Sequence, residues 1–421
     1  MNVRKLALEA IEKITRKKAF CNIVVNEFLN KFELSEEDRR LFTNLVYGTI
    51  QNLITIDFYL EPYIRRKKPK SWVKNLLYIS VYQIVYLDIP KYAIVNESVD
   101  IANIKDKAIG SFVNAVLRNF LRIPLRSLDG YDDIQRLSIK YSHPMWLVAY
   151  LLKDYSLEVL EKILQENSLI KNDAIRINTL KTNKEAIKTK LTEANIQFSD
   201  NALVENGLTI NKSIVNHPLF TEGFITIQDI SSQMVSEITN PEPNSLILDL
   251  CSAPGGKAAH LAALMNNTGT IFACDVYPHK IKLMEQTFER LGVNNVKTQL
   301  IDARNVANKV KKESFDYLIA DVPCSGLGVL SHKVDLKYQI TLKAIEEVEY
   351  LQEEILEKSY QLLKRGGYLI YSTCTINKDE NEKQIAKFLR RHEDFTKVEE
   401  RIILPFEYHT DGFYICKLRR N

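Results

Sequence analysis

The stretch LILDLCSAPGGKAAHLAALMNNTGTIFACDV, residues Leu246–Val276, decides the fold of the C-terminal half of this chain. A short apolar run (246–250) is followed by a turn of small residues, a helical segment from about Lys257, and a second apolar run (270–276). Short apolar strands that alternate with helices are typical of a mostly parallel sheet with helices on both faces. The stretch therefore predicts the first two strands of a doubly wound α/β domain.

The same alternation continues to the end of the chain. We expect a helix over Pro278–Leu291, strands at 296–302, 315–323 and 367–374, and a long helix near 341–363. The final segments IILPFEY and GFYICKL flank an Asp411-Gly412 turn and predict an antiparallel hairpin at the sheet edge. Residues 231–421 are thus expected to form a Rossmann-like α/β doubly wound domain.

The N-terminal part has a different sequence pattern. Residues 1–122 show helical periodicity almost throughout, with helix starts expected at Ser35 and Asn96, and Ile123–Gly130 is interpreted as a linker. Further helices follow over 131–170, and β-branched runs around a helical stretch indicate a small α+β element over 171–230. We predict a multidomain protein: an all-α domain at 1–125, a helical linker with a small α+β (RRM-like) subdomain at 126–230, and the α/β domain at 231–421.

Composition excludes several classes of protein. The chain has 421 residues, of which 45% are hydrophobic and 26% charged, as expected for folded globular domains. Its six cysteines form no CxxC pair, so we expect reduced thiols, no structural zinc and no other metal site. Glu9 and Glu12 interrupt the N-terminal apolar positions, and no apolar run is long enough to span a membrane. We therefore expect a cytoplasmic protein that does not bind a membrane.

The charge is concentrated in the first third. Residues 1–126 hold 21 Lys+Arg against 13 Asp+Glu, whereas the chain as a whole carries only +4. Such an excess favours a polyanion as partner, because each cation placed on a phosphate releases condensed counterions. The densest cluster consists of Arg65, Arg66, Lys67, Lys68 and Lys70. We predict that this cluster binds RNA; the alternative is a solvated loop between two helices.

The turn after the first predicted strand has the residues of a cofactor site: Asp249-Leu250-Cys251-Ser252-Ala253-Pro254-Gly255-Gly256-Lys257. Small side chains at a helix start let a ligand approach the backbone. The turn is not a Walker phosphate loop, because Cys251 stands where that loop needs glycine and Ala258 where it needs serine or threonine. It also lacks the GxGxxG spacing of dinucleotide sites. We expect Cys251–Lys257 to bind a cofactor of another kind.

Two more carboxylates are predicted at the ends of the next strands. Asp275 lies 19 residues after Gly256, where a carboxylate accepts both ribose hydroxyls, and Asp302 ends the third strand, placed to meet an adenine edge. Each alone is also consistent with a helix cap or a surface pair. Three carboxylates at three successive strand ends, without a pyrophosphate loop, fit a nucleoside cofactor such as S-adenosylmethionine.

Two cysteines follow strands that we expect to be neighbours, Cys324 in DVPCSG (321–326) and Cys374 in STCT (372–375). Methylation of carbon 5 of a pyrimidine requires a nucleophile at carbon 6, and a thiolate of lowered pKa suits that step. A second group must then remove the carbon 5 proton, while the Asp321 carboxyl can share a proton with ring nitrogen 3. Three other cysteines are expected to be small buried apolar side chains: Cys21, Cys274 and Cys416.

These residues closely resemble the RNA cytosine-C5 methyltransferases, specifically the bacterial small-subunit ribosomal RNA enzymes (the RsmB/Sun/Fmu family) with an N-terminal NusB-like helical domain. The resemblance spans essentially the whole chain and rests on these segments: SAPGGK (252–257), DVPCSGLG (321–328), YSTCT (371–375), GFITIQDISSQM (223–234), RINTLK (176–181), DGFYICKL (411–418) and FVNAVLRNFLR (112–122). One segment departs from the family pattern: Ser331–Asp335 lacks the usual arginine and proline, which puts target-loop contacts in doubt.

The resemblance implies a role for each matching residue. Cys374 is implied as the nucleophile, Cys324 as the group that assists product release, and Asp321 as a contact to the cytosine. Residues 252–257 are implied to hold the methionine end of S-adenosylmethionine, with Asp275 at the ribose and Asp302 at the adenine. Arg176 and Arg304 are interpreted as RNA or structural contacts. The expected substrate is 16S ribosomal RNA or a small-subunit assembly intermediate, acted on by a monomer. A transfer RNA methyltransferase and a non-catalytic RNA-binding or antitermination factor are the alternatives.

Overall fold

The computed structural model describes residues 2–169 and 171–421, which form two compact units. The first unit holds the residues up to Leu169 together with Leu330–Gln339, and the second holds 171–329 and 340–421. The chain therefore passes from the second unit into the first and back again after the DVPCSG motif. Among the described residues, no helix combines the length and the apolar character needed to cross a membrane.

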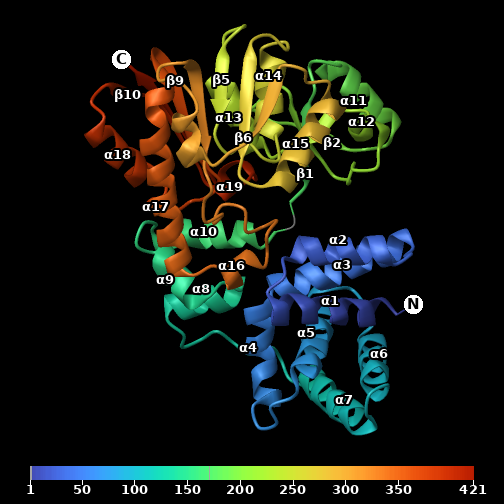
Figure 1. The fold of residues 1–421 in the computed structure, drawn as a ribbon. Coiled ribbons are helices and arrows are strands. Elements are labelled where there is room, and N and C mark those ends of the chain that lie inside the picture. Colours follow the sequence, from blue (N-terminus) through green and yellow to red (C-terminus); the bar gives the residue numbers. More distant parts are fainter. Residues whose placement is uncertain (1, 170) are drawn as a thin grey trace. The chain divides into compact units, whose positions relative to one another are not determined.

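The first unit is all-α, as predicted (Figure 1). Apolar residues recur at helical spacing, and those of the first helix, Leu6, Ala10 and Ile14, are buried in the common core. The helices of this unit before residue 169 are α1 (Val3–Lys17), α2 (Cys21–Lys31), α3 (Glu36–Gln51), α4 (Leu53–Ile64), α5 (Ser71–Tyr86), α6 (Lys91–Asn103), α7 (Lys107–Arg122), α8 (Asp133–Tyr141), α9 (Met145–Leu151) and α10 (Leu157–Asn167).

Of the two predicted helix starts, one is confirmed and one is wrong. The Ser35 side chain caps α3 by accepting a hydrogen bond from the Asp38 N–H at 3.2 Å. Asn96 instead lies inside α6, which begins at Lys91 directly after Pro90. Proline suits this position, because a helix start does not need its missing N–H. Residues 123–130, interpreted as a linker, contain neither helix nor strand, but they lie within the first unit.

The segment Leu330–Gln339 is built into the first unit and ends in the short helix α16 (Leu336–Gln339). Val334 packs into the core of the helices. Lys337 is fully buried, and its Nζ donates a hydrogen bond to the Gln51 carbonyl oxygen at 2.9 Å. Burial lowers the pKa of Lys337 to about 7. The stretch that departs from the family pattern thus leads into a segment anchored in the helical core.

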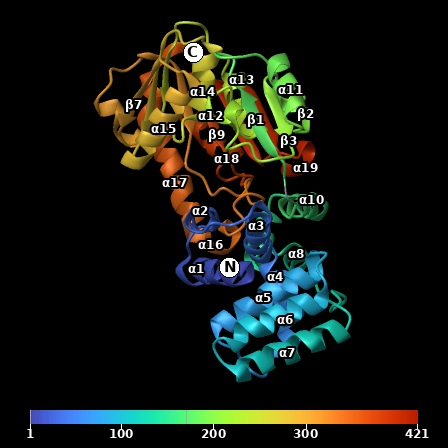
Figure 2. The same cartoon turned by 90° about the vertical axis from the view of Figure 1, so that its right-hand side faces the viewer.

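The second unit begins with the predicted small α+β element. Its four strands pair in the order β2-β3-β1-β4, all antiparallel. Figure 2 shows β1, β2 and β3 together with α11. The elements are β1 (Asp173–Ile177), α11 (Lys184–Glu193), β2 (Phe198–Asp200), β3 (Gly207–Ile210), α12 (Pro218–Thr221) and β4 (Ile225–Ile227).

A seven-stranded sheet of order β10-β11-β9-β8-β5-β6-β7 carries the rest of the second unit. The strands from β9 to β7 are parallel to one another, whereas β11 is antiparallel to both of its neighbours, β9 and β10. The predicted mostly parallel sheet is confirmed. The chain order reverses between β5 and β8, the point at which such sheets bind ligands. The strands are β5 (Leu246–Asp249), β6 (Thr270–Asp275), β7 (Val296–Leu300), β8 (Phe315–Asp321), β9 (Leu363–Thr373), β10 (Phe395–Ile403) and β11 (Phe413–Arg420).

Helices cover both faces of this sheet because its central strands are apolar on both sides. Ile247 and Ile319 pack with helices α13, α14 and α15, whereas their neighbours Leu248 and Leu318 pack with η1, α17 and α18. The bounds are α13 (Ile230–Thr239), α14 (Gly256–Leu264), α15 (Pro278–Leu291), the 3-10 helix η1 (Ala303–Asn308), α17 (Leu342–Ser359) and α18 (Glu382–Arg391).

The predicted terminal hairpin is confirmed as an antiparallel pair with β10 at the sheet edge, but its turn is not a tight one. The connection from Ile403 to Phe413 contains the short helix α19 (Pro405–Tyr408). Gly412 is needed for another reason: a Cβ there would lie 2.6 Å from Ile376 Cγ2 and 2.9 Å from Gly328 Cα, and its N–H donates to the Gly328 carbonyl oxygen at 2.8 Å. A Cβ on Gly328 would lie 1.9 Å from the Gly412 carbonyl oxygen, so the two backbones meet only because both residues are glycine.

Candidate active site

The predicted cofactor turn lies at the carboxyl end of β5 and leads into α14. Its backbone is tied to the neighbouring strand, because the Ser252 N–H donates to the Cys274 carbonyl oxygen at 2.8 Å. Gly255 has a φ of +95°, a conformation that favours glycine, and a Cβ there would also lie 3.0 Å from the Phe288 ring. The turn therefore places small residues and a helix start beside the end of the sheet.

Asp249 is the unpaired carboxylate of this site. It is fully buried, and neither of its oxygens nor the Ser252 hydroxyl has a hydrogen-bond partner among the described residues. Burial raises the pKa of Asp249 to about 7. A buried carboxylate without donors is costly, and such groups normally have a partner. Asp249 and Ser252 thus fit a ligand that brings hydrogen-bond donors, such as an ammonium group.

The other two predicted carboxylates lie on the next two strands, in the expected order. Asp275 ends β6, is buried, and accepts a hydrogen bond from the Tyr277 N–H at 3.1 Å. Asp302 follows β7 and is held by Arg304, whose Nη2 lies 2.7 Å from its carboxylate. Hydrogen bonds from Arg304 hold the pKa of Asp302 below its usual range, although burial opposes this. Arg304 is therefore positioned against a site carboxylate.

The two cysteines predicted to lie over one pocket are in contact with each other. Cys324 follows β8 and Cys374 follows β9, which are adjacent parallel strands, and their Sγ atoms lie 3.3 Å apart. The hydrogen bond to Cys374 and burial raise the pKa of Cys324 well above its ordinary range. Loss of the Cys324 proton is therefore disfavoured while Cys374 lies beside it.

Asp321 and Lys257 form an ion pair beside the cysteines. Lys257 Nζ lies 2.7 Å from Asp321 Oδ2, and the Ser372 hydroxyl donates to Asp321 Oδ1 at 2.8 Å. Although burial opposes the charged form, Asp321 and then Cys374 raise the pKa of Lys257. The lysine of the cofactor turn is thus a fixed positive charge next to Cys374 and Asp321, an arrangement that stabilises a thiolate.

A buried network behind the cysteines was not predicted as part of the site. Glu380 is fully buried and accepts hydrogen bonds from the Ser325 N–H at 2.8 Å, from Gln352 Nε2 at 3.0 Å and from Asn377 Nδ2 at 3.0 Å. It ties the loop that contains Cys324 to the loop that follows Cys374. Glu380 lies six positions after Cys374, in the stretch Asp379-Glu380-Asn381 that follows YSTCT and belongs to the family resemblance, although no role was assigned to it.

The predicted RNA contacts have different environments. Arg65, Arg66, Lys67, Lys68 and Lys70 are all exposed in the loop between α4 and α5. Arg176 is instead only 1% exposed, and its Nε donates to Gln228 Oε1 at 2.8 Å. Burial lowers the pKa of Arg176 to about 9. A surface contact between Arg176 and RNA is therefore wrong for this structure, because β1 directs the side chain into the interior.

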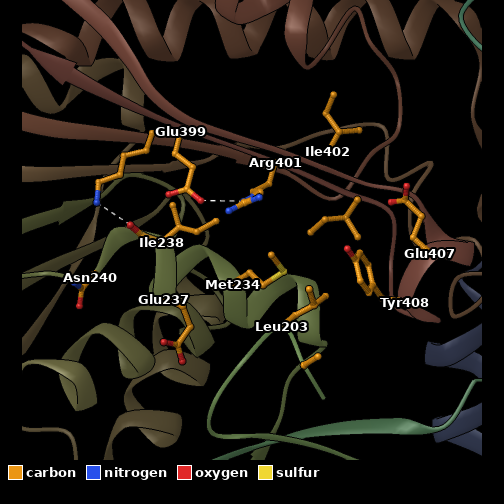
Figure 3. A pocket seen from close by; sticks show the side chains of 13 residues that line it. Leu203, Met234, Glu237, Ile238, Asn240, Glu399, Arg401, Ile402, Glu407 and Tyr408 are labelled. Carbon is orange, nitrogen blue, oxygen red and sulfur yellow. Dashed lines mark hydrogen bonds and ion pairs between the residues drawn. The ribbon is translucent and has the colours of Figure 1, made fainter. Parts of the chain in front are cut away.

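The three cysteines predicted to be buried, Cys21, Cys274 and Cys416, are buried, and all six cysteines are free. The second unit also has a hollow of about 640 Å³ between α13 and β10 (Figure 3). The two basic side chains that line it already have hydrogen-bond partners: Arg401 Nε donates to Glu399 at 2.9 Å, and Lys417 Nζ donates to the Ile238 carbonyl oxygen at 2.8 Å. We do not place the chemistry there.

Comparison with known sequences identifies the family. The sequence model described as 16S rRNA methyltransferase RsmB/F matches residues 236–419, the NusB family model matches 1–122, and a ferredoxin-like domain model of RsmF/B-type proteins matches 143–216. A Bacillus subtilis protein described as probable ribosomal RNA small subunit methyltransferase B is 36% identical over 100% of this chain and 99% of its own.

The chain belongs to the RsmB/F family of 16S rRNA methyltransferases. A Synechocystis protein of the same description is 33% identical over 100% of both chains. The crystal structure of the protein PH0851 has a TM-score of 0.84 and 25% identity, covering 100% of this chain and 99% of that one. The predicted NusB-like domain is confirmed, and the chain is an RNA methyltransferase rather than a non-catalytic factor. Its cofactor is that of the family, S-adenosylmethionine.

Proposed function

We propose that this enzyme methylates carbon 5 of a cytosine in 16S ribosomal RNA, at the 967-type position, through a covalent bond to Cys374. The observation that carries the proposal is the pair of thiol sulfurs 3.3 Å apart, beside the Lys257–Asp321 ion pair. A binding site for RNA alone has no use for two adjacent thiols next to a buried lysine.

Cys374 acts first. Because Cys324 retains its proton and Lys257 supplies a positive charge, Cys374 is the sulfur that becomes the thiolate. Its Sγ bonds to carbon 6 of the cytosine, and the 5,6 double bond moves electron density to carbon 5. Asp321 lies in the same site, and its carboxyl can hold a proton at nitrogen 3 of the cytosine ring. The base becomes electron-rich at the atom to be methylated.

S-adenosylmethionine, when bound, supplies the methyl group to carbon 5. Cys324 then completes the reaction. Once Cys374 has bonded to carbon 6, it no longer carries a negative charge or accepts a hydrogen bond from Cys324, so the pKa of Cys324 falls. The Cys324 thiolate can take the carbon 5 proton, the 5,6 double bond re-forms, and the bond between Cys374 and carbon 6 breaks. The products are 5-methylcytosine, S-adenosylhomocysteine and the free enzyme, and the proton that Cys324 first carried is released to solvent.

The residues that would hold the cofactor are those at the ends of β5, β6 and β7. Asp249 and Ser252 offer unpaired acceptors for the methionine end, with the turn from Cys251 to Gly256 around it. Asp275 is at the ribose and Asp302 at the adenine. Lys257 supplies the positive charge beside Cys374, because its Nζ forms an ion pair with Asp321.

RNA binding is assigned to the helical domain over residues 1–125, with Arg65–Lys70 on phosphates and the α/β domain over 231–421 performing the chemistry. The substrate is 16S ribosomal RNA, free or in a small-subunit assembly intermediate, and the enzyme acts as a cytoplasmic monomer. The exposed position of the cluster and the NusB-like domain support this assignment. A target base in a duplex must be flipped out or already unpaired.

The test is methyl transfer from labelled S-adenosylmethionine to unmodified 16S ribosomal RNA and to transfer RNA in parallel, followed by nucleoside analysis. We expect labelled 5-methylcytosine only in the ribosomal RNA. Label only in transfer RNA would keep the chemistry and refute the substrate. A methylated nucleoside other than 5-methylcytosine would refute the chemistry. A Cys374→Ala variant, which must give no label, is the matched control.

A further inference from the structure

Besides the basic cluster Arg65–Lys70, the first unit has an apolar hollow of about 580 Å³ at its surface. It lies between the C-terminal end of α4 and that of α7, two helices that pack against each other, and is closed by the chain that follows α7. The residues that form its walls and matter for its chemistry are Tyr59, Tyr63, Phe120, Ile123, Leu125 and Arg126.

The walls of this hollow are aromatic rings and exposed aliphatic side chains. The rings of Tyr63 and Phe120 lie edge to face with centroids 5.7 Å apart. Ile123 and Leu125 are 57% and 48% exposed, in a segment outside the helices. Apolar side chains gathered around a hollow at a protein surface mark a binding site more often than isolated ones do.

One cation, Arg126, lines the hollow. The Arg126 guanidinium lies over the Phe58 ring at 4.3 Å and donates to the Tyr131 hydroxyl at 2.6 Å, so its plane is held in place. Arg118 and Arg122 are exposed on α7. The sequence contains no aspartate or glutamate from Lys107 to Leu128.

The cluster Arg65–Lys70 begins immediately after α4, two residues beyond Tyr63. Glu61, in ion-pair range of Arg126 at 3.6 Å, is the acidic residue of this helix end. An apolar hollow of aromatic rings beside a basic cluster combines the two elements of single-strand recognition, a surface for stacking a base and cations for the phosphates on either side of it.

We propose that this hollow receives an unstacked base of single-stranded ribosomal RNA, while Arg65–Lys70 bind the adjoining phosphates. The occupant is RNA rather than an apolar peptide, because an apolar peptide has no negative charge to complement Arg126 and the exposed cluster Arg65–Lys70 that follows α4, whereas the phosphates beside a base do. The proposal rests on the proposed function only in that the ligand is RNA. It adds a base contact in the helical domain, separate from the target cytosine.

The test compares two oligoribonucleotides of equal length, one normal and one in which consecutive nucleotides are abasic, so that phosphates are kept and bases lost. The full-length enzyme is expected to bind the normal strand roughly five- to tenfold more tightly in fluorescence anisotropy. Equal dissociation constants for the two strands would overturn the proposal.

Matched variants locate the contact. Leu125→Glu places a negative charge in the hollow, and Ile104→Glu places the same charge on the same unit, at a position that is 70% exposed and does not line it. We expect Leu125→Glu to abolish the preference for bases and Ile104→Glu to leave it intact. Loss of the preference in both variants, or in neither, would contradict the proposal.

Crosslinking needs no variant. RNA that carries 4-thiouridine is expected to crosslink to peptides containing Tyr59–Tyr63 or Phe120–Arg126, and crosslinks found only elsewhere would contradict the proposal. Formation of 5-methylcytosine in 16S ribosomal RNA is measured with the same protein. Methylation without a preference for bases refutes only the base contact, whereas the preference without methylation refutes only the proposed function.

Discussion

The Sγ atoms of Cys324 and Cys374 lie 3.3 Å apart although 50 positions separate the residues in the sequence. Two adjacent parallel strands bring them together, and the buried Glu380 fastens the loop of one cysteine to the segment after the other. In the proposed mechanism, this contact lets Cys324 keep its proton while Cys374 becomes the nucleophile. Several properties of the enzyme are expected to depend on this pair.

The two cysteines should behave differently when replaced. Cys324→Ser is expected to slow turnover about 10²–10⁴-fold, as loss of a general base does, and to accumulate a covalent protein–RNA adduct that survives a denaturing gel. Cys374→Ser should abolish methylation without an adduct, because no bond to carbon 6 forms. Cys21→Ala removes a buried thiol of the first unit and serves as the control, with activity unchanged. An adduct in Cys374→Ser would reverse the assigned roles.

The same contact predicts sensitivity to oxidation. Hydrogen peroxide is expected to join the two sulfurs as a disulfide, each thiol losing one hydrogen while the peroxide is reduced to two waters. Activity should fall and return on treatment with dithiothreitol, and mass spectrometry of peptides should show Cys324 linked to Cys374. Reversible loss of activity in the Cys324→Ser variant at the wild-type rate would show that another thiol is responsible.

Lys257 is expected to support the nucleophile rather than only the cofactor. Lys257→Met removes the positive charge beside Cys374 and leaves Asp321 without its ion-pair partner, so the pKa of Cys374 should rise. The rate should then depend on pH at higher values than in the wild type, with kcat reduced about 10²-fold or more. The KM for S-adenosylmethionine separates the roles: a raised KM with an unchanged kcat and pH profile would assign Lys257 to cofactor binding alone.

Asp249 makes the stability of the cofactor-free enzyme depend on pH. Its pKa is raised by burial to about 7, so the folded protein binds a proton between about pH 4 and pH 7 that the unfolded chain does not bind. The free energy of unfolding therefore falls as pH rises through this window. Asp249→Asn should flatten this dependence and raise the Tm of the cofactor-free enzyme at pH 8, while weakening S-adenosylmethionine binding. A variant less stable than the wild type at pH 8 would contradict this explanation.

The exposed cluster after α4 should contribute to the salt dependence of RNA binding. Replacing Arg65, Arg66, Lys67 and Lys68 by Gln is expected to weaken binding at low salt and to reduce the slope of log Kd against log salt concentration, because fewer counterions are released. Circular dichroism checks that the helices remain intact. Replacing four exposed lysines of the second unit, which lacks the cluster, is the control. An unchanged slope in the cluster variant would show that these residues form a solvated loop.

Much of the site could be predicted because its signals are local. The small residues before Lys257, the carboxylates at strand ends, and the cysteines after their strands all follow from apolar runs and turn residues a few positions apart. Because parallel strands end at one edge of the sheet, the order of the strands along the chain already predicts that Cys324 and Cys374 lie close together. The helical domain could be predicted equally well, because apolar residues recur at helical spacing in α1 and its neighbours and are buried there.

Other features were decided only by tertiary structure, because burial and pairing depend on residues far apart in the chain. Arg176 was interpreted as an RNA or a structural contact, and only the structure shows that β1 turns it inward onto Gln228. Lys257 was expected at the cofactor, yet its Nζ reaches Asp321, 64 positions away. Lys337 follows the DVPCSG loop but is buried against Gln51, 286 positions away. A lysine or arginine carries the same charge in any sequence; whether it meets water, a carboxylate or a carbonyl oxygen is settled only when distant elements pack around it.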